Sequence, residues 1–265
     1  RYFRAEGTQG PRIVMDAPPA QEDCRPFVTV ARLLTGAGLH APQVLEWVEA
    51  AGFMLLDDLG SCTYLARLDV LERDPQRADP LYRDALDALV HLQGIDAQAQ
   101  VKPYDRAFMQ REMDLYPEWY AQRHRGKPFD AKQQQVWSTV CTRLLDQIAT
   151  QPVGLVHRDY HCRNLMVCAP REAEGAGPAP NPGILDFQDA VWGPLTYDLV
   201  SLLRDAYVDW DEPVQIDWAV RWWQSARAAG LPVREDFGEV WRQLEWMGLQ
   251  RHLKVLGIFC RLKHR

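Results

Sequence analysis

The chain has 265 residues and a mass of 30.4 kDa, which is enough for one large domain or two lobes. Its net charge of −6 argues against a nucleic-acid partner, because phosphate backbones demand clustered Lys and Arg. No apolar run reaches membrane-spanning length and no signal peptide is visible, so we expect a cytoplasmic protein without a membrane partner.

The six cysteines stand at irregular intervals without a CxxC pair. This pattern favours reduced thiols in the cytosol over a disulfide framework or a zinc site. They are Cys24, Cys62, Cys141, Cys162, Cys168 and Cys260. For Cys162, which lies in the segment interpreted below as catalytic, a filler role in a turn is favoured over a reactive thiol.

The first sixty residues predict a small antiparallel sheet with one helix. Residues 2–4 and 12–16 flank a turn at 7–10, which is typical of a hairpin. Apolar side chains at helical spacing predict a helix over 23–38. A second pair of strands is predicted at 42–47 and 52–56, followed by a connector at 57–60.

Beyond the connector the pattern becomes helical. Asp79–Pro80 predicts a helix start, and that helix ends at Gly94. Asp130 with Gln133 resembles a capping box and predicts the start of another helix. Helices dominate again from Thr196 onward.

Between these helical regions the periodicity returns to brief apolar strands, predicted at 155–156, 165–167 and 183–185. The segment 170–182 is rich in Ala, Pro and Gly and predicts a mobile surface loop. The predicted fold class is α+β, with a small antiparallel-sheet lobe over residues 1–60 and a larger, mainly helical lobe over residues 61–265. Ligands usually bind in a cleft between such lobes.

The strongest chemical signal is the segment HRDYHCRN at 157–164. The spacing from Asp159 to Asn164 matches the catalytic loop of protein-kinase-like enzymes. Phosphoryl transfer requires an oriented acceptor hydroxyl and a metal that neutralises the phosphates. A loop between two strands can direct Asp159 at the acceptor and Asn164 at Mg²⁺, because an amide oxygen is a ligand that adds no charge.

A second signal is the apolar strand that ends in Asp186, within ILDFQD at 184–189. It is similar to the D-F-G element and predicts Asp186 as a metal ligand. Gln188 stands where protein kinases have Gly, which points away from protein kinases. Asp198 opens a later helix, where it is expected to accept backbone N–H bonds from the catalytic loop. The ordered combination is far more specific than either motif alone.

Other interpretations of these residues are weaker. His157 and His161 have the spacing of a metal pair, but that geometry needs a helix and the segment predicts a strand. Asp57 and Asp58 could perform acid/base chemistry, although a connector role is favoured at the end of an apolar strand. The ten tryptophans suggest a carbohydrate platform or, more simply, core packing.

The three elements in order resemble the aminoglycoside phosphotransferase and choline kinase superfamily, which has a protein-kinase-like two-lobed fold. Over essentially the whole chain there is a closer resemblance to the anomeric N-acetylmuramate/N-acetylglucosamine kinases of bacterial cell-wall recycling. It is carried by VMDAPP at 14–19, LYPEWY at 115–120, residues 185–197 and QRHLKV at 250–255. This resemblance implies phosphorylation of the C1 hydroxyl of a small amino sugar, with ATP and Mg²⁺ and no obligatory protein partner.

Carried over by position, the resemblance implies Asp159 as the catalytic base and Asn164 and Asp186 as the metal ligands. The connector residues Asp57, Asp58 and Leu59 would meet adenine through their backbone.

The chain departs from the family pattern on the phosphate side. The lysine expected on the third strand of the N-terminal lobe is absent, and Met15 occupies that region. Arg4 and Arg12 are the alternative phosphate-binding cations. The chain opens on Arg1 rather than Met, so we expect the start of this lobe, with the loop that covers the phosphates, to be truncated.

Candidates for sugar binding lie in the helical part. A lactyl carboxylate favours a nearby cation, and hydroxyls favour polar side chains; a structural role is the alternative for each candidate. They are Tyr120, Arg204, Asp205, Arg251, His252 and Lys254.

The leading hypothesis is therefore an ATP-dependent sugar 1-kinase, with the preference between the two amino sugars left open. One alternative is a phosphotransferase for another small alcohol, such as an aminoglycoside or choline. A nucleotide-binding pseudokinase scaffold is the other. The missing lysine favours the scaffold, whereas the intact set of Asp159, Asn164 and Asp186 opposes it.

Overall fold

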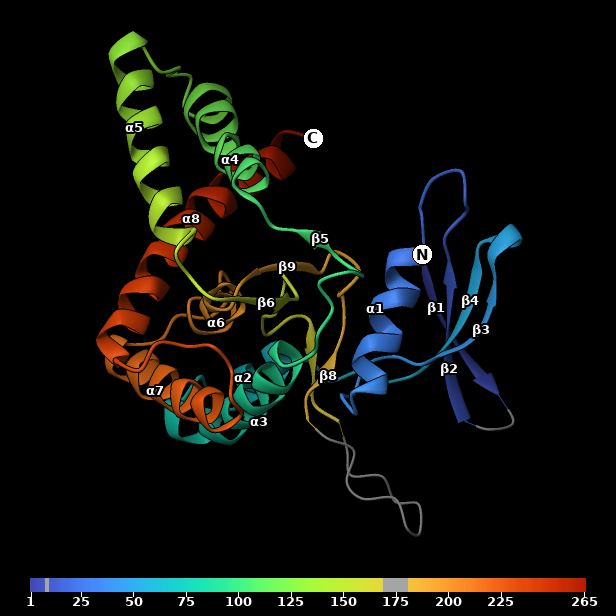
Figure 1. Cartoon of the computed structure of the whole chain (residues 1–265). Helices are drawn as coiled ribbons and strands as arrows, with labels where there is room; N and C mark the ends of the chain where they lie inside the picture. Colours follow the sequence, from blue (N-terminus) through green and yellow to red (C-terminus); the bar gives the residue numbers. More distant parts are fainter. Residues whose placement is uncertain (8–9, 169–180) are drawn as a thin grey trace.

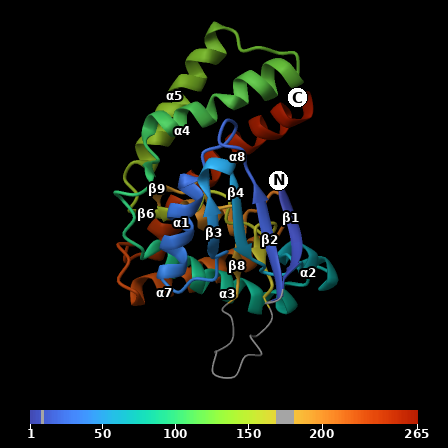
Figure 2. The ribbon, with the colours of Figure 1, turned by 90° about the vertical axis from the view of Figure 1, so that its right-hand side faces the viewer.

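The computed structural model describes residues 1–7, 10–168 and 181–265. They form a small sheet with one helix at the N-terminal end and a larger, mainly helical part, which lie side by side in Figure 1. In Figure 2 the sheet faces the viewer, in front of the helical part. The α+β class expected from the sequence is confirmed.

The N-terminal sheet has four antiparallel strands in the order β1-β2-β4-β3. The strands are β1 (Tyr2–Gly7), β2 (Gly10–Asp16), β3 (Val44–Val48) and β4 (Phe53–Asp57), with the short 3₁₀ turn η1 (Glu49–Ala51) between the last two. Tyr2 pairs with Met15, which confirms the predicted hairpin, although its turn at residues 8–9 lies outside the described residues. Met54 and Leu56 alternate with more exposed neighbours and are buried.

Helix α1 (Arg25–Gly36) lies between this sheet and the helical part in Figure 1. The side chains that the helical spacing marked as apolar, Phe27, Val30, Ala31 and Leu34, are all buried in the core. The predicted helix is therefore confirmed. After β4, residues 58–63 lead to the helical part.

The helical part contains a small set of inserted strands. Its helices are α2 (Tyr64–Val70), α3 (Pro75–Gln93), α4 (Arg106–Met113), the π-helix η2 (Tyr116–His124), α5 (Ala131–Ile148), α6 (Thr196–Leu203), α7 (Glu212–Ala228) and α8 (Phe237–His264). Its strands are β5 (Lys102–Pro103), β6 (Val153–Val156), β7 (Leu165–Met166), β8 (Gly183–Ile184) and β9 (Val191–Pro194). The strands pair as β5-β9-β6 and as β7-β8.

The start of α3 corrects the sequence interpretation. Asp74, rather than Asp79, is the N-cap, and its carboxylate accepts from the backbone N–H groups of Gln76 and Arg77. Pro80 therefore lies inside the helix. Both Asp-Pro pairs fit the same start signal, and the structure uses the earlier one. The predicted capping box at the start of α5 is confirmed.

Several further expectations can be compared with the structure. No disulfide joins the six cysteines, all of which lie in the described ranges. Among the described helices, none combines the length and apolarity that a bilayer crossing requires. Trp210, Trp218 and Trp222 are buried in the core. The predicted loop at 170–182 lies almost entirely outside the described residues, which resume at Asn181.

Candidate active site

The loop between β6 and β7 carries the HRDYHCRN segment and is fixed at its base by a buried carboxylate. Asp198, at the start of α6, accepts hydrogen bonds from the backbone N–H of His157 (2.6 Å) and of Arg158 (3.0 Å). Burial raises the pKa of Asp198 to about 7, although its two backbone hydrogen bonds oppose that shift. The structural role expected for Asp198 is confirmed.

His157 connects this loop to the strand that precedes Asp186. Its Nε2 atom lies 2.9 Å from the carbonyl oxygen of Leu185, and the backbone N–H of Asp159 lies 3.2 Å from its Nδ1 atom. A carbonyl can only accept and an amide can only donate, so the proton is on Nε2. Burial lowers the pKa of His157 to about 4, which keeps the ring neutral near pH 7.

Two residues of the site hold a backbone conformation that favours glycine. Arg158 has φ of 78° and Asp186 has φ of 65°. Such positions are costly for residues with a side chain, and they concentrate at functional sites. Here they turn the chain sharply just before Asp159 and at the carboxylate of Asp186.

Asn164 and Asp186 meet at the edge of a pocket. The Asn164 amide donates to Oδ2 of Asp186 at 3.2 Å and to the backbone oxygen of Asp159 at 3.0 Å. The Gln188 amide donates to the other oxygen of Asp186 at 2.9 Å. A carboxylate beside an amide is an oxygen-donor set that suits Mg²⁺, which keeps several water or phosphate ligands. The side chains present therefore fit this ion.

Asp159 is largely enclosed yet kept ionised. Burial raises the pKa of its carboxyl, but the positive charge of Lys254, assisted by Arg158, brings it below its ordinary value. An ionised carboxylate can accept a hydrogen bond from an acceptor hydroxyl and then take its proton.

A buried ionic network lies beside this loop. Glu112 on α4 lies 2.6 Å from Arg158 and 3.1 Å from Lys254 on α8. Tyr104 donates to the same carboxylate, and Lys254 donates to Tyr197 at 2.7 Å. Glu112 and Tyr104 were not among the residues predicted from the sequence. No local pattern marks them, because Glu112 meets Arg158 and Lys254 from positions 46 and 142 residues away.

The pocket next to Asp186 has a volume of about 420 Å³ and lies between the sheet and the helical part. Ile13 and Leu56 line it from the sheet, and Met166 and Leu185 line it from the other side. The connector residues Asp57, Asp58 and Leu59 also line it, as do Asn164 and Asp186. Apolar walls with a polar edge are typical of a small-molecule site.

The cationic and apolar candidates on the phosphate side lie in different places. Arg4 lines the pocket and forms two hydrogen bonds with the Asp58 carboxylate, at 2.6 and 3.0 Å. Arg12 is partly exposed, and its Nη1 atom donates to the carbonyl oxygen of the adjacent Pro11. Met15 is packed in the hydrophobic core and is not among the residues that line the pocket.

The sugar-binding candidates do not converge as a group. The Arg204 guanidinium is engaged by Glu245 and Gln215, and the exposed ring of His252 lies 3.5 Å from the Arg204 carbonyl oxygen. Tyr120 stacks on Tyr116 within η2, with ring centroids 5.1 Å apart.

Asp205 and Arg251 lie nearer the catalytic loop. Asp205 accepts from the backbone N–H of Cys162 at 3.0 Å. Arg251 is buried, and its charge acts on His161 and Asp198. Of the sugar-binding candidates, the structure therefore brings these two to the loop, together with Lys254, whose charge acts on Asp159.

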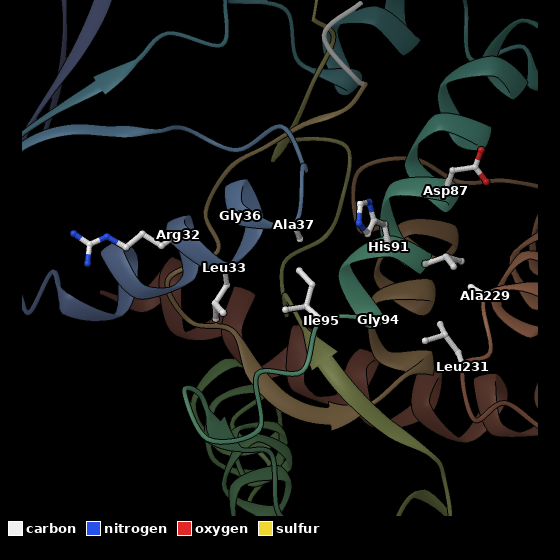
Figure 3. A pocket seen from close by; sticks show the side chains of 11 residues that line it. Arg32, Leu33, Gly36, Ala37, Asp87, His91, Gly94, Ile95, Ala229 and Leu231 are labelled. Carbon is white, nitrogen blue, oxygen red and sulfur yellow. The ribbon is translucent and has the colours of Figure 1, made fainter. Parts of the chain in front are cut away.

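A larger cavity of about 680 Å³ lies elsewhere, between the ends of α1 and α3 and the residues that follow α7 (Figure 3). Arg32, Asp87 and His91 are among its lining side chains. No residue of the catalytic loop lines it. The smaller pocket is therefore the candidate nucleotide site.

Comparison with known proteins agrees with this geometry. Residues 1–238 match the family model described as "Phosphotransferase enzyme family". The chain is 46% identical over its full length to the N-acetylmuramate/N-acetylglucosamine kinase of Pseudomonas aeruginosa, and spans 74% of that protein. It is 43% identical to the kinase of the same name from Neisseria meningitidis serogroup B, again over its full length and over 76% of the relative.

Solved structures support the kinase-like fold. The GDP complex of wild-type aminoglycoside 2'-phosphotransferase-IIIa aligns over 99% of this chain and 84% of its own, with a TM-score of 0.63 and 14% identity. Aminoglycoside phosphotransferase APH(2'')-Ib in its ADP-bound form aligns over 94% of this chain and 92% of its own, with a TM-score of 0.57 and 14% identity. These likenesses confirm the protein-kinase-like fold expected from the sequence.

Proposed function

Because the chain belongs to the phosphotransferase enzyme family, which implies use of a nucleotide substrate, we propose that it transfers the γ-phosphoryl group of ATP to the C1 hydroxyl of N-acetylmuramate and N-acetylglucosamine. The observation that carries the proposal is the placement of Asp159, Asn164 and Asp186 together, with the last two at the edge of the pocket. The full-length relatives with that substrate name support the choice of sugar.

In the proposed reaction, the Asp159 carboxylate accepts the hydrogen bond of the C1 hydroxyl and takes its proton. A bond forms between the sugar oxygen and the γ-phosphorus, and the bond from that phosphorus to the β–γ bridging oxygen breaks, so that ADP leaves. An anomeric hydroxyl is more acidic than an ordinary alcohol, so a carboxylate that mainly orients it suffices. Asn164 and Asp186 would hold Mg²⁺, which neutralises phosphate charge when bound.

On the nucleotide side, we assign the adenine contact to the backbone of Asp57, Asp58 and Leu59, and a phosphate-side role to Arg4. This assignment treats residues 1–60 as the nucleotide-side lobe and residues 61–265 as the lobe that carries the loop and the sugar site. Met15 supports the sheet from the core. The proposed location is the cytoplasm, where ATP is available.

The function is tested by incubating the purified protein with Mg²⁺, ATP and each of four acceptors: N-acetylmuramate, N-acetylglucosamine, kanamycin and choline. ADP release is expected with the two amino sugars, and the product is expected to show coupling between phosphorus and the anomeric proton by NMR. Release with kanamycin or choline alone would favour the other small-alcohol kinases. If none of the four acceptors causes ADP release although the protein binds the nucleotide, a scaffold role is favoured.

Asp159→Asn tests the role of the base. The variant is expected to lower kcat by about a thousandfold, because general base catalysis contributes about 10²- to 10⁴-fold, and to leave ATP affinity nearly unchanged. Turnover close to that of the wild type would contradict the assignment.

A further inference from the structure

The buried cations near the catalytic loop differ in their partners. Arg158 and Lys254 share the carboxylate of Glu112. The Nε atom of Arg158 is buried without an acceptor, but its guanidinium is paired with Glu112. Arg251, in contrast, has no ion pair among the described residues, which also offer no hydrogen-bond acceptor to its Nη1, although only 4% of the residue's surface is exposed. Burying a charged donor without a partner is costly, so such an atom points to a missing ligand.

A second buried polar atom without a hydrogen-bond partner among the described residues, the Nδ1 atom of His161, lies close to Arg251. The charge of Arg251 acts on His161, which in turn interacts with Asp159 and Asp205. The two unpartnered atoms therefore belong to one region, next to the proposed base.

The position of Arg251 on α8 supports the same placement. It precedes Lys254 by three residues, and residues at this spacing share a helix face. Lys254 is the cation that acts most strongly on the carboxylate of Asp159. The face of α8 that carries both residues is thus directed at the catalytic loop.

We propose that Arg251 binds the lactyl carboxylate of N-acetylmuramate and so selects the acidic sugar at the acceptor site. The inference rests on the proposed sugar kinase function. A guanidinium fork matches a carboxylate in geometry and charge, whereas the hydroxyls and acetamido group of N-acetylglucosamine carry no net charge. His161 contributes its Nδ1 atom to the polar groups that both sugars share.

The test is a cycle of variants and substrates. The kcat/KM values of the wild type and Arg251→Met are measured with N-acetylmuramate, its neutral methyl ester and N-acetylglucosamine. With N-acetylmuramate, the variant is expected to lose about a hundredfold, mainly in KM, as is usual when a buried charge pair loses one partner. With the ester and with N-acetylglucosamine it is expected to stay within about threefold of the wild type, because the paired charge is absent from both substrates.

Two further variants keep the test informative. Arg221→Met removes an exposed arginine of α7 that pairs with Asp217. This variant should leave kcat/KM unchanged with all three substrates. Arg251→Lys keeps the charge without the fork, and should recover part of the affinity for N-acetylmuramate. Thermal unfolding of each variant shows whether Arg251→Met folds, and if it does not, Arg251→Lys carries the comparison.

Equal losses on the acidic and neutral sugars would overturn the assignment of Arg251 to the carboxylate. So would a wild type that does not distinguish N-acetylmuramate from its ester. A wild type that phosphorylates none of the three substrates would instead overturn the proposed function, so the two failures are distinct.

Discussion

His157 donates from Nε2 to the carbonyl oxygen of Leu185 at 2.9 Å while its Nδ1 atom accepts from the backbone N–H of Asp159. One neutral imidazole thus joins the loop of the proposed base to the residue before the proposed metal carboxylate, Asp186. Because both ring nitrogens are used, protonation of the buried ring would remove an acceptor and break the second bond.

This arrangement predicts acid sensitivity. The pKa of His157 is about 4 in the folded protein and near 6.5 when exposed, so the unfolded chain binds more protons between these values. Stability is fully present above pH 6.5 and is lost as pH falls toward 4, by about 3 kcal/mol in all. Urea unfolding measures the free energy of unfolding of the wild type and of His157→Gln at several pH values in this range. Its dependence on pH should correspond to about one proton less for the variant than for the wild type. Identical slopes for variant and wild type would contradict the prediction.

The Glu112 network predicts strong coupling between its members. Glu112→Gln leaves Arg158 and Lys254 as buried cations without their shared carboxylate, and should destabilise the fold by about 3–5 kcal/mol. Lys254→Met in the same background should cost less than it does alone, because the uncompensated charge is removed. Urea unfolding of both single variants and the double variant measures this difference.

A matched control for this cycle is Glu118→Gln. Glu118 is half exposed and lies 3.6 Å from the exposed Arg123, so its loss should change stability by less than about 1 kcal/mol. Additive effects of Glu112→Gln and Lys254→Met would argue against a shared network.

Replacement of Arg4 and replacement of Arg12 should differ in their effect on the KM for ATP. Arg4→Met removes a cation from the pocket wall and frees Asp58, so the KM for ATP should rise by about tenfold, with a smaller change in kcat. Arg12→Met removes a partly exposed cation that does not line the pocket, and should leave the KM for ATP within about twofold. Steady-state kinetics with varied ATP compare the two, and a reversed order would transfer the phosphate-side role to Arg12.

Asp186→Asn should specifically weaken the binding of Mg²⁺. Loss of the carboxylate charge should raise the Mg²⁺ concentration for half-maximal activity by more than about tenfold, because Mg²⁺ is held by only one or two protein carboxylates. Binding of ATP without added metal, measured by calorimetry, should change little. An unchanged Mg²⁺ dependence would exclude Asp186 as a ligand.

The features that the sequence predicted correctly are short-range. The first hairpin, helix α1 and the capping box of α5 depend on residues within a few positions of one another. Asp198 was also placed correctly, because an acidic residue at a helix start next to the loop has few other roles. The start of α3 was wrong since two Asp-Pro pairs compete, and only packing selects Asp74.

The features that the sequence could not predict depend on long-range contacts. Glu112, Arg158 and Lys254 meet only because α4 and α8 pack beside the loop. The positive φ angles of Arg158 and Asp186 could not be predicted, because neither position holds the glycine that usually indicates this conformation. The placement of Arg251 near the loop likewise depends on which face of α8 turns inward.

The hydrogen bonds of His157 have a consequence for which part of the chain shapes the site. Asp159, Asn164 and Asp186 all follow the connector at 57–60, and the imidazole joins the segments that carry Asp159 and Asp186. The Asn164 amide adds a further link, to the Asp159 backbone and the Asp186 carboxylate. The geometry of these three side chains is therefore built within the helical part and its inserted strands, whereas the four-stranded sheet supplies one wall of the neighbouring pocket.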